Sequence, residues 1–282
     1  MEQFKRAAFS ILLTITLLLF HFHAHALQVD VEPSEISIGD AFVIKINGAE
    51  TVMPEASLNG AALHFGKCGD GCFMAIGTAG LKTPPGVHSI RLEIRGKATE
   101  IPLTVKHTAF PEIKLTLDAK KVFLSPEDLK RAEIEREKLK AIFQAASGKH
   151  WDGNFITPLK NEFSTGFGVK RIINKEKISI HEGLDIRGKE GEEIMASNSG
   201  RVVLAEGLFF GGNTVVIDHG LGIYTVYMHL SEIKVSLNSI VSKGDVIGLV
   251  GATGRASGPH LHFGVKIGGI SANPASIFNL KL

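Results

Sequence analysis

The chain has 282 residues and a formal net charge of +2, with 31 lysines and arginines against 29 aspartates and glutamates. This length is enough for two modest domains, each with its own core. The charged residues are interspersed and form neither a basic block nor an acidic tail, so the composition does not point to a nucleic-acid-binding protein.

The first 26 residues have the pattern of an export signal. Lys5 and Arg6 precede the apolar run AAFSILLTITLLLF, and residues 24–26 (AHA) match the small-x-small cleavage pattern. The apolar run is shorter than the roughly 20 residues that a membrane-spanning helix needs. We therefore predict a signal peptide over residues 1–26, an exported protein and no stable membrane span after cleavage; an uncleaved anchor is the alternative.

Residues 27–108 alternate between apolar and polar side chains in short runs, as in EISIGDAFVIKING and HSIRLEIRGKATEIPLTVKH. Turn residues such as Asn47-Gly48 and Asn59-Gly60 separate these runs. Short alternating strands punctuated by turns are typical of an antiparallel β-sandwich, and we predict an immunoglobulin-like one.

The only two cysteines, Cys68 and Cys72, lie in the stretch CGDGC within this region. An oxidising compartment outside the cytoplasm permits a disulfide, and a Gly-Asp-Gly turn can close a tight loop. The spacing differs from the two-residue spacing of thioredoxin-type redox motifs. We therefore predict a structural disulfide.

Residues 109–150 are predicted to be a linker that contains a helix of about five turns. Ser125 is a candidate N-cap, Pro126 occupies the first helical position, acidic residues follow, and Gly148 comes after the end. The apolar positions of this helix form a rough stripe: Leu129, Ile134, Leu139, Ile142 and Phe143.

Residues 151–282 return to short strands separated by glycines, as in NTVVIDHG, GIYTVYMHL and LHFGVKIGG, which predicts a second all-β domain. The stretches EEIMASNSGRVVLA (192–205) and NSIVSKGDVIGLV (238–250) share a cadence that also occurs in the small barrels that carry biotin or lipoate. Lys243 lacks the flanking residues that such a modification requires, so this alternative rests on a weak motif.

Histidines gather in three short motifs of this second region: HEGLD (181–185), YMHL (227–230) and HLH (260–262). His260 and His262 are alternate residues of a predicted strand, so they face the same side about 6.6 Å apart. On a regular strand His181 and Asp185 would be about 13 Å apart. We therefore predict a bend at Glu182-Gly183, with His181 in a loop and Asp185 on the following strand.

Two imidazoles and one carboxylate, with one position left open, form a catalytic zinc set. Zinc lowers the pKa of a bound water to about 7, which makes a nucleophile available at neutral pH. Iron(II) uses a similar set, but an oxygenase would not need two further unligated histidines beside the metal.

The segment from about Pro158 to Pro274 resembles the lysostaphin-type, or LytM-like, zinc metalloendopeptidases, which cut peptidoglycan peptides. The stretch FSTGFGVKR resembles their opening Phe-Gly-x-Arg segment, at Phe167, Gly168 and Arg171 with one extra residue between. It is followed in order by HEGLDI, GNTVVIDHGLGIYTVYMHL, VSKGDVIGLVGATGRASGPHLHFGV and NP. The four motifs that follow this opening segment, taken in the family order, are far more specific than any one of them.

The resemblance implies that His181, Asp185 and His262 hold one zinc ion per chain. His229 and His260 would be the unligated pair, of which one accepts a proton from the zinc-bound water or both stabilise the oxyanion. We leave His219 outside the site as a turn residue, and Glu182 as an outward-pointing neighbour. Two tyrosines, Tyr224 and Tyr227, belong either to the substrate groove or to the core.

The predicted function is therefore that of an exported zinc metalloendopeptidase in the periplasm or cell envelope, with peptidoglycan peptides as substrate. The alternative is a LytM-like regulator without catalytic activity that activates a cell-wall amidase. An exported wall hydrolase needs restraint, so inhibition of the site by the N-terminal domain is a further expectation.

Overall fold

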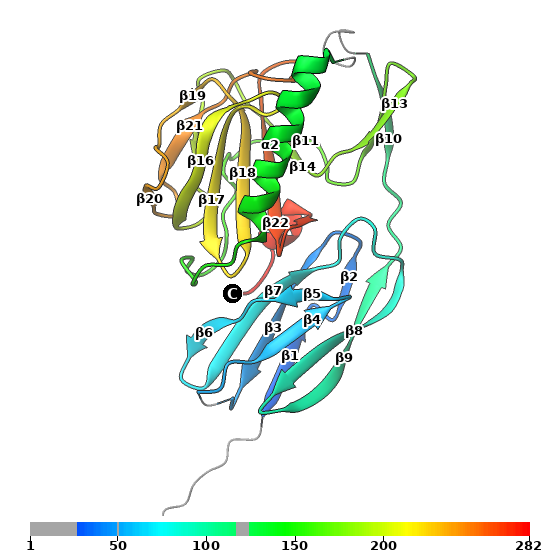
Figure 1. Ribbon diagram of the computed structural model, residues 1–282, viewed down its shortest axis with the longest axis vertical. Helices are drawn as coiled ribbons and strands as arrows, with labels where there is room; N and C mark the ends of the chain where they lie inside the picture. The colour runs from blue at the N-terminus through cyan, green and yellow to red at the C-terminus, as the bar shows by residue number, and fades with distance from the viewer. Residues whose placement is uncertain (1–26, 50, 117–123) are drawn as a thin grey trace, which may run out of the picture.

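The computed structural model describes residues 27–49, 51–116 and 124–282, and nearly all of its elements are strands (Figure 1). The predicted signal segment, residues 1–26, lies outside this described part. Within the described ranges no helix has both the length and the apolar character needed to cross a bilayer. The prediction of a mainly β protein is confirmed.

The N-terminal sandwich consists of two sheets that face each other across a shared core. One sheet has the order β1 (Gln28–Glu32), β3 (Ala41–Asn47), β7 (Cys72–Thr78), β6 (Gly66–Gly69). The other has the order β2 (Glu35–Ser37), β9 (Lys97–Lys106), β8 (Gly86–Ile94), β4 (Glu55–Leu58), β5 (Ala61–Leu63). Ile44 and Phe73 of the first sheet meet Leu92 and Leu103 of the second in one buried cluster. Two sheets around one core match the predicted sandwich, and its immunoglobulin-like character stays a prediction.

Cys68 and Cys72 form a disulfide at the hairpin between β6 and β7, as predicted. Cys72 is buried, and its Cα pairs with Asn47 on β3. The bond therefore joins the hairpin tip to a strand inside the sheet.

The segment after the sandwich contains a strand as well as the predicted helix. Strand β10 (Glu112–Leu115) pairs in parallel with β12 (Lys170–Ile173), which pairs with β13 (Lys177–Ile180). Residues 112–115 thus join a three-stranded sheet with later parts of the chain, although the sequence indicated only a linker there. The exact domain boundaries stay a prediction.

Helix α2 (Pro126–Gln144) begins as predicted, because the Ser125 side chain accepts a hydrogen bond from the Asp128 backbone N–H at 3.1 Å. The prediction of an apolar stripe on this helix is only partly correct. Leu139, Ile142 and Phe143 pack on the sheet, whereas Leu129 and Ile134 are 55% and 61% exposed. At 3.6 residues per turn, Ile134 lies about 140° around the helix from Leu139 and points away from the sheet.

The C-terminal region is built on one large antiparallel sheet. Its strands have the order β11 (Phe163–Thr165), β14 (Gly183–Arg187), β22 (His260–Ile267), β18 (Ile223–Leu230), β17 (Gly212–Gly220), β16 (Gly200–Leu208), β20 (Ile240–Val241), and β23 (Ile270–Ala272) pairs with β22. A smaller sheet has the order β15 (Glu193–Met195), β21 (Val246–Leu249), β19 (Glu232–Ile233).

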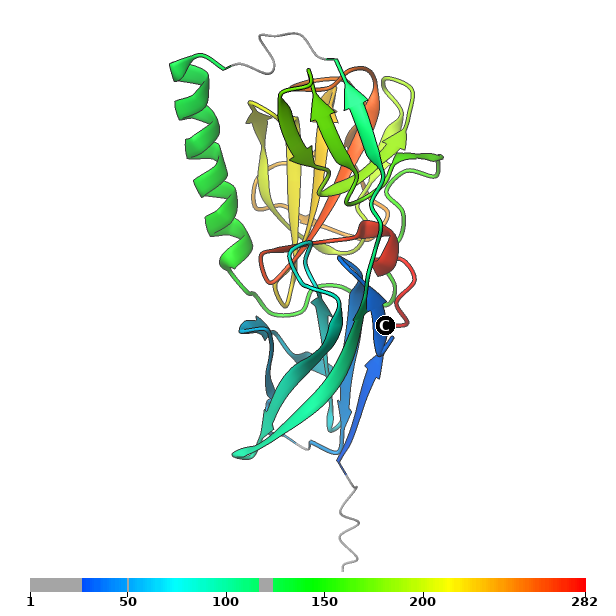
Figure 2. The same cartoon turned by 90° about the vertical axis from the view of Figure 1, so that its right-hand side faces the viewer.

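The two faces of the large sheet are covered by different parts of the protein. Leu261, Phe263 and Val265 of β22 point into the main core. The other face carries Tyr224 and Val226, and α2 lies along it (Figures 1 and 2). Because side chains alternate along a strand, His260 and His262 belong to the face that α2 covers.

The sandwich and the C-terminal region share apolar packing. Met74 and Ile76 of β7 belong to the same buried cluster as Ile277 of the short helix α3 (Pro274–Ile277), which the sequence did not indicate. The Asn273 side-chain amide donates to Asp40 Oδ1 at 2.7 Å, and the Ala41 N–H donates to Ser276 Oγ at 2.9 Å. Figure 2 shows the red α3 segment where the blue strands of the sandwich meet the C-terminal sheet.

Candidate metal centre and active site

Three of the predicted site residues meet at the paired strands β14 and β22. Asp185 lies directly opposite His262 in the antiparallel register, and His181 lies in the loop between β13 and β14. Gly183 makes this meeting possible, because a Cβ there would lie 2.6 Å from the His262 ring and 2.7 Å from the Phe263 carbonyl oxygen. Gly183 is the first residue of β14 and is not among the glycines with a positive φ, so glycine is required here by this close approach and not by the unusual torsions that the predicted bend would need.

The donor atoms of these three residues converge closely. His181 Nε2 and His262 Nδ1 each lie 2.9 Å from Asp185 Oδ1, and the two nitrogens are 3.0 Å apart. Two imidazole lone pairs at this distance repel each other unless a proton or a cation lies between them. A set of two nitrogens and one carboxylate oxygen is also the donor set that zinc accepts, so the chemistry of the cluster fits a zinc ion.

Neighbouring groups fix the orientation of these donors. His181 Nδ1–H donates to the Gly166 carbonyl at 2.7 Å, which leaves the lone pair on Nε2. Arg171 Nη2 donates to Asp185 Oδ2 at 2.6 Å, so Oδ1 is the oxygen that faces the imidazoles. Burial opposes ionisation of Asp185, but the close contacts with His181 and His262 hold its pKa well below its usual value. The carboxylate is therefore charged at neutral pH.

His229 and His260 stand beside the cluster, with their rings 4.9 Å apart. His229 Nδ1–H donates to the Thr253 carbonyl at 2.9 Å, and His260 Nδ1–H donates to the Gly258 carbonyl at 2.8 Å. Nε2 of each ring is consequently the nitrogen available to a water or a substrate, and His260 Nε2 lies 3.8 Å from Asp185 Oδ1. Burial, helped by the charges of His260 and His262, lowers the pKa of His229 to about 4.

His219 and the two tyrosines lie outside this cluster. His219 is in strand β17 rather than in the predicted turn, and it is fully buried. Its Nδ1–H donates to the Ser199 carbonyl at 2.8 Å, and its Nε2 lies 2.7 Å from Thr225 Oγ1. Tyr224 and Tyr227 are 1% and 0% exposed, so both are core residues.

Glu182 points away from the donor atoms. Its carboxylate accepts hydrogen bonds from Lys266 Nζ at 3.0 Å and Ser271 Oγ at 2.6 Å, which tie the His181 loop to β22 and β23. The role of Lys266 was missed, although its place four residues after His262 puts both side chains on one face of β22. Arg171 was assigned to a motif, but its contact with Asp185 was not foreseen.

Comparisons with known proteins identify the domain that carries these residues. Residues 179–274 match the model of Peptidase family M23. DD-carboxypeptidase/endopeptidase Mpg of Neisseria meningitidis is 41% identical over 124 residues, which are 43% of this chain and 28% of that protein. Peptidoglycan DD-endopeptidase ShyA of Vibrio cholerae is 38% identical over 115 residues, 40% of this chain and 27% of that protein. The matches thus span less than a third of either relative.

A solved structure from Pseudomonas aeruginosa assigned to peptidase M23 superposes with a TM-score of 0.68 and 29% identity, covering 86% of this chain and 94% of that one. The fold, the matched segment and the His–Asp–His cluster together define a metallopeptidase-type β domain. Residues 179–274 form a domain of peptidase family M23, the lysostaphin or LytM type, and the resemblance seen in the sequence is confirmed.

Proposed function

We propose that the protein is an exported zinc metalloendopeptidase that hydrolyses peptide bonds in peptidoglycan stem peptides or cross-links. The observation that carries this proposal is the convergence of His181 Nε2, Asp185 Oδ1 and His262 Nδ1 within 3.0 Å. Relatives that share the M23 domain are named peptidoglycan DD-endopeptidases, which supports the choice of substrate.

Zinc held by His181, Asp185 and His262 would supply Lewis acidity and a water of lowered pKa. Residues of the chain then transfer the proton. Because carbonyl oxygens occupy Nδ1 of His229 and His260, either Nε2 can accept the proton of the attacking water and return it to the departing amine. A protonated Nε2 can also donate to the oxyanion that develops on the scissile carbonyl.

A peptidoglycan substrate implies that the protein works in the periplasm or elsewhere in the cell envelope, outside the cytoplasm. This location agrees with the predicted signal peptide and with the Cys68–Cys72 disulfide, since disulfides persist in oxidising compartments.

Digestion of isolated peptidoglycan by residues 27–282, with zinc and with a chelator, tests the proposal. We expect soluble muropeptides only when zinc is present. A zinc-loaded protein that releases none would reject the proposed activity.

The second candidate is a LytM-like regulator without catalytic activity that activates a cell-wall amidase. A chain that only regulates has no need for a complete set of ligands and bases, and here all five residues lie together. A metal titration separates the candidates, because failure to bind one zinc per chain would favour the regulator.

We further propose that the N-terminal part of the chain restrains the enzyme. The motivation is that α2 lies on the face of the sheet that carries His262. Residues 151–282 are expected to cleave faster than residues 27–282. Because Ile76 shares a core with Ile277, the shorter fragment is compared only after circular dichroism shows that it is folded. Equal rates would remove this proposal.

A further inference from the structure

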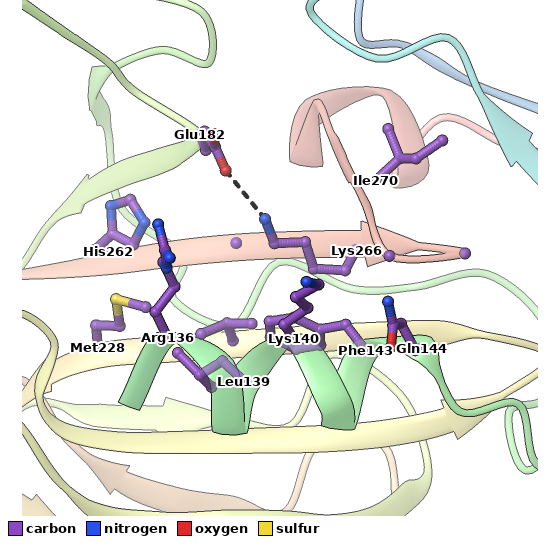
Figure 3. A pocket seen from close by; sticks show the side chains of 14 residues that line it. Arg136, Leu139, Lys140, Phe143, Gln144, Glu182, Met228, His262, Lys266 and Ile270 are labelled. Carbon is purple, nitrogen blue, oxygen red and sulfur yellow. Dashed lines mark hydrogen bonds and ion pairs between the residues drawn. The ribbon is translucent and has the colours of Figure 1, made fainter. Parts of the chain in front are cut away.

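A cavity of about 510 Å³ lies between α2 and the large sheet, and His262 is one of its lining residues. Figure 3 shows this groove, with side chains of α2 on one side and those of β18 and β22 on the other. The groove therefore continues directly from the candidate metal centre, and α2 forms its wall without filling it.

The groove between α2 and the sheet is largely apolar and open. Leu139 and Phe143 of α2 and Val226 and Met228 of β18 line it. Gly264, between His262 and Lys266 on β22, has no side chain to close it. A Cβ at Gly264 would meet only the Val226 side chain, at 3.5 Å, which is an ordinary contact. Packing does not require glycine at this position, whereas an open groove does.

Three cationic side chains line the groove: Arg136, Lys140 and Lys266. Among the residues that the structure describes, Glu182 is the only acid that lines the groove, and it binds Lys266. Arg136 and Lys140 extend from α2 toward β22 (Figure 3), and within the described ranges their ion pairs are with acids of their own helix. Because these ion pairs are largely exposed, they contribute little to stability, and a ligand carboxylate can take the place of the glutamates. The groove thus has an excess of two positive charges.

We propose that this groove binds the substrate peptide on one side of the scissile bond, and that Arg136 and Lys140 bind a carboxylate of that peptide. The inference rests on the proposed peptidase function. The helix α2 then has two roles: it narrows access to the site, and it supplies the side chains that select acidic peptides. Its removal should therefore speed cleavage overall while removing the preference for acidic peptides. A guanidinium and an ammonium are the side chains best suited to this recognition.

Equilibrium binding tests the proposal on residues 27–282 carrying His260→Ala to prevent turnover. The probes are a fluorescent stem-peptide dimer with free diaminopimelate carboxylates and the same dimer with those carboxylates amidated. We expect the acidic dimer to bind about tenfold more tightly than the amidated one. The double change Arg136→Gln and Lys140→Gln should abolish this preference without weakening zinc binding.

Lys130→Gln is the matched control, since Lys130 is exposed on α2 and does not line the groove. It should preserve the preference. A second variant, Gly264→Leu, should weaken binding of both dimers by plugging the groove. Equal binding of the two dimers, or a preference that survives the double change, would overturn the proposal. Failure of the underlying peptidase function would instead appear as the absence of zinc-dependent cleavage by the unsubstituted protein.

Discussion

The two oxygens of Asp185 have different environments, and the difference assigns a role to Arg171. Oδ1 lies among the imidazole nitrogens, while Oδ2 is bound by the Arg171 guanidinium at 2.6 Å. Arg171 is thus a positioning residue, which acts through the carboxylate that it orients.

Arg171→Met is expected to lower zinc affinity by about 10- to 100-fold, because changes in the groups that orient metal ligands typically have effects of this size. Competition with a fluorescent chelator measures the affinity. Arg187→Gln is the control, since Arg187 pairs with Glu162 on the surface with 67% of its side chain exposed. Equal affinities for the two variants would show that Arg171 does not orient Asp185.

His219 predicts a pH dependence of stability that is separate from catalysis. Burial lowers the pKa of His219 to about 4 in the folded protein, against 6.5 for an ordinary histidine. Between these pH values the unfolded chain takes up a proton that the folded chain does not, so stability is complete above pH 6.5 and falls toward pH 4. The slope from this group is at most about 1.4 kcal/mol per pH unit.

Urea unfolding at several pH values between 7 and 5 tests this prediction. His219→Gln should show a shallower fall in the free energy of unfolding than the unsubstituted protein, because its buried side chain does not titrate. Parallel curves for the two proteins would show that His219 is not the group responsible.

At the scale of single elements, the loop before β14 depends on the lack of a side chain at Gly183. Gly183→Ala would bring a Cβ within 2.7 Å of the Phe263 carbonyl oxygen, and this backbone atom cannot move aside easily. We expect a loss of about 1–3 kcal/mol of stability, as for other overpacked sites, together with weaker zinc binding.

Thermal unfolding and a zinc titration measure both effects of Gly183→Ala. Gly207→Ala, on β16, is the matched control, because the nearest atom to its Cβ would be Asn213 Oδ1 at 3.7 Å. If the two alanine variants bind zinc equally well, the close approach at Gly183 does not control the site.

Much of the architecture could be predicted from short-range patterns. Alternation in ISIHEGLDIRG, interrupted by a glycine, correctly indicated that His181 is in a loop and Asp185 on a strand. Ser125 and Pro126 correctly marked the start of α2. These features depend on neighbours in sequence, which is why the sequence alone reveals them.

Features that depend on distant partners were missed. Strand β10 is a strand because β12 pairs with it, more than 50 residues later in the chain. Helix α3 has only four residues, too few for a periodic pattern. The groove beneath α2 lies between this helix and strands that follow it by about a hundred residues. No pattern among neighbouring residues indicates that these elements are close together.

At the scale of the whole molecule, the shared core predicts that the sandwich and the C-terminal region unfold together. The single tryptophan, Trp151, is 3% exposed and belongs to the same buried cluster as Ile76 of the sandwich. Ile76→Ala should therefore destabilise both regions, by about 2–5 kcal/mol as for other buried Ile→Ala changes.

Trp151 fluorescence and far-ultraviolet circular dichroism, followed in the same urea titration, test this coupling. Both signals should move to the same lower midpoint in Ile76→Ala, whereas Val87→Ala, at a position that is 73% exposed, should leave the midpoint unchanged. A shift confined to circular dichroism would mean that the two regions unfold independently.

The most direct test of the account combines zinc stoichiometry with mass spectrometry of the muropeptides released from peptidoglycan. For residues 27–282 we expect one zinc per chain and new peptide termini that disappear with a chelator. His262→Ala should lose the zinc, and His229→Ala should keep it while cleaving about 10²- to 10⁴-fold more slowly, the usual contribution of a general base. Cleavage that persists without zinc, or a folded chain that binds none, would contradict the central claim.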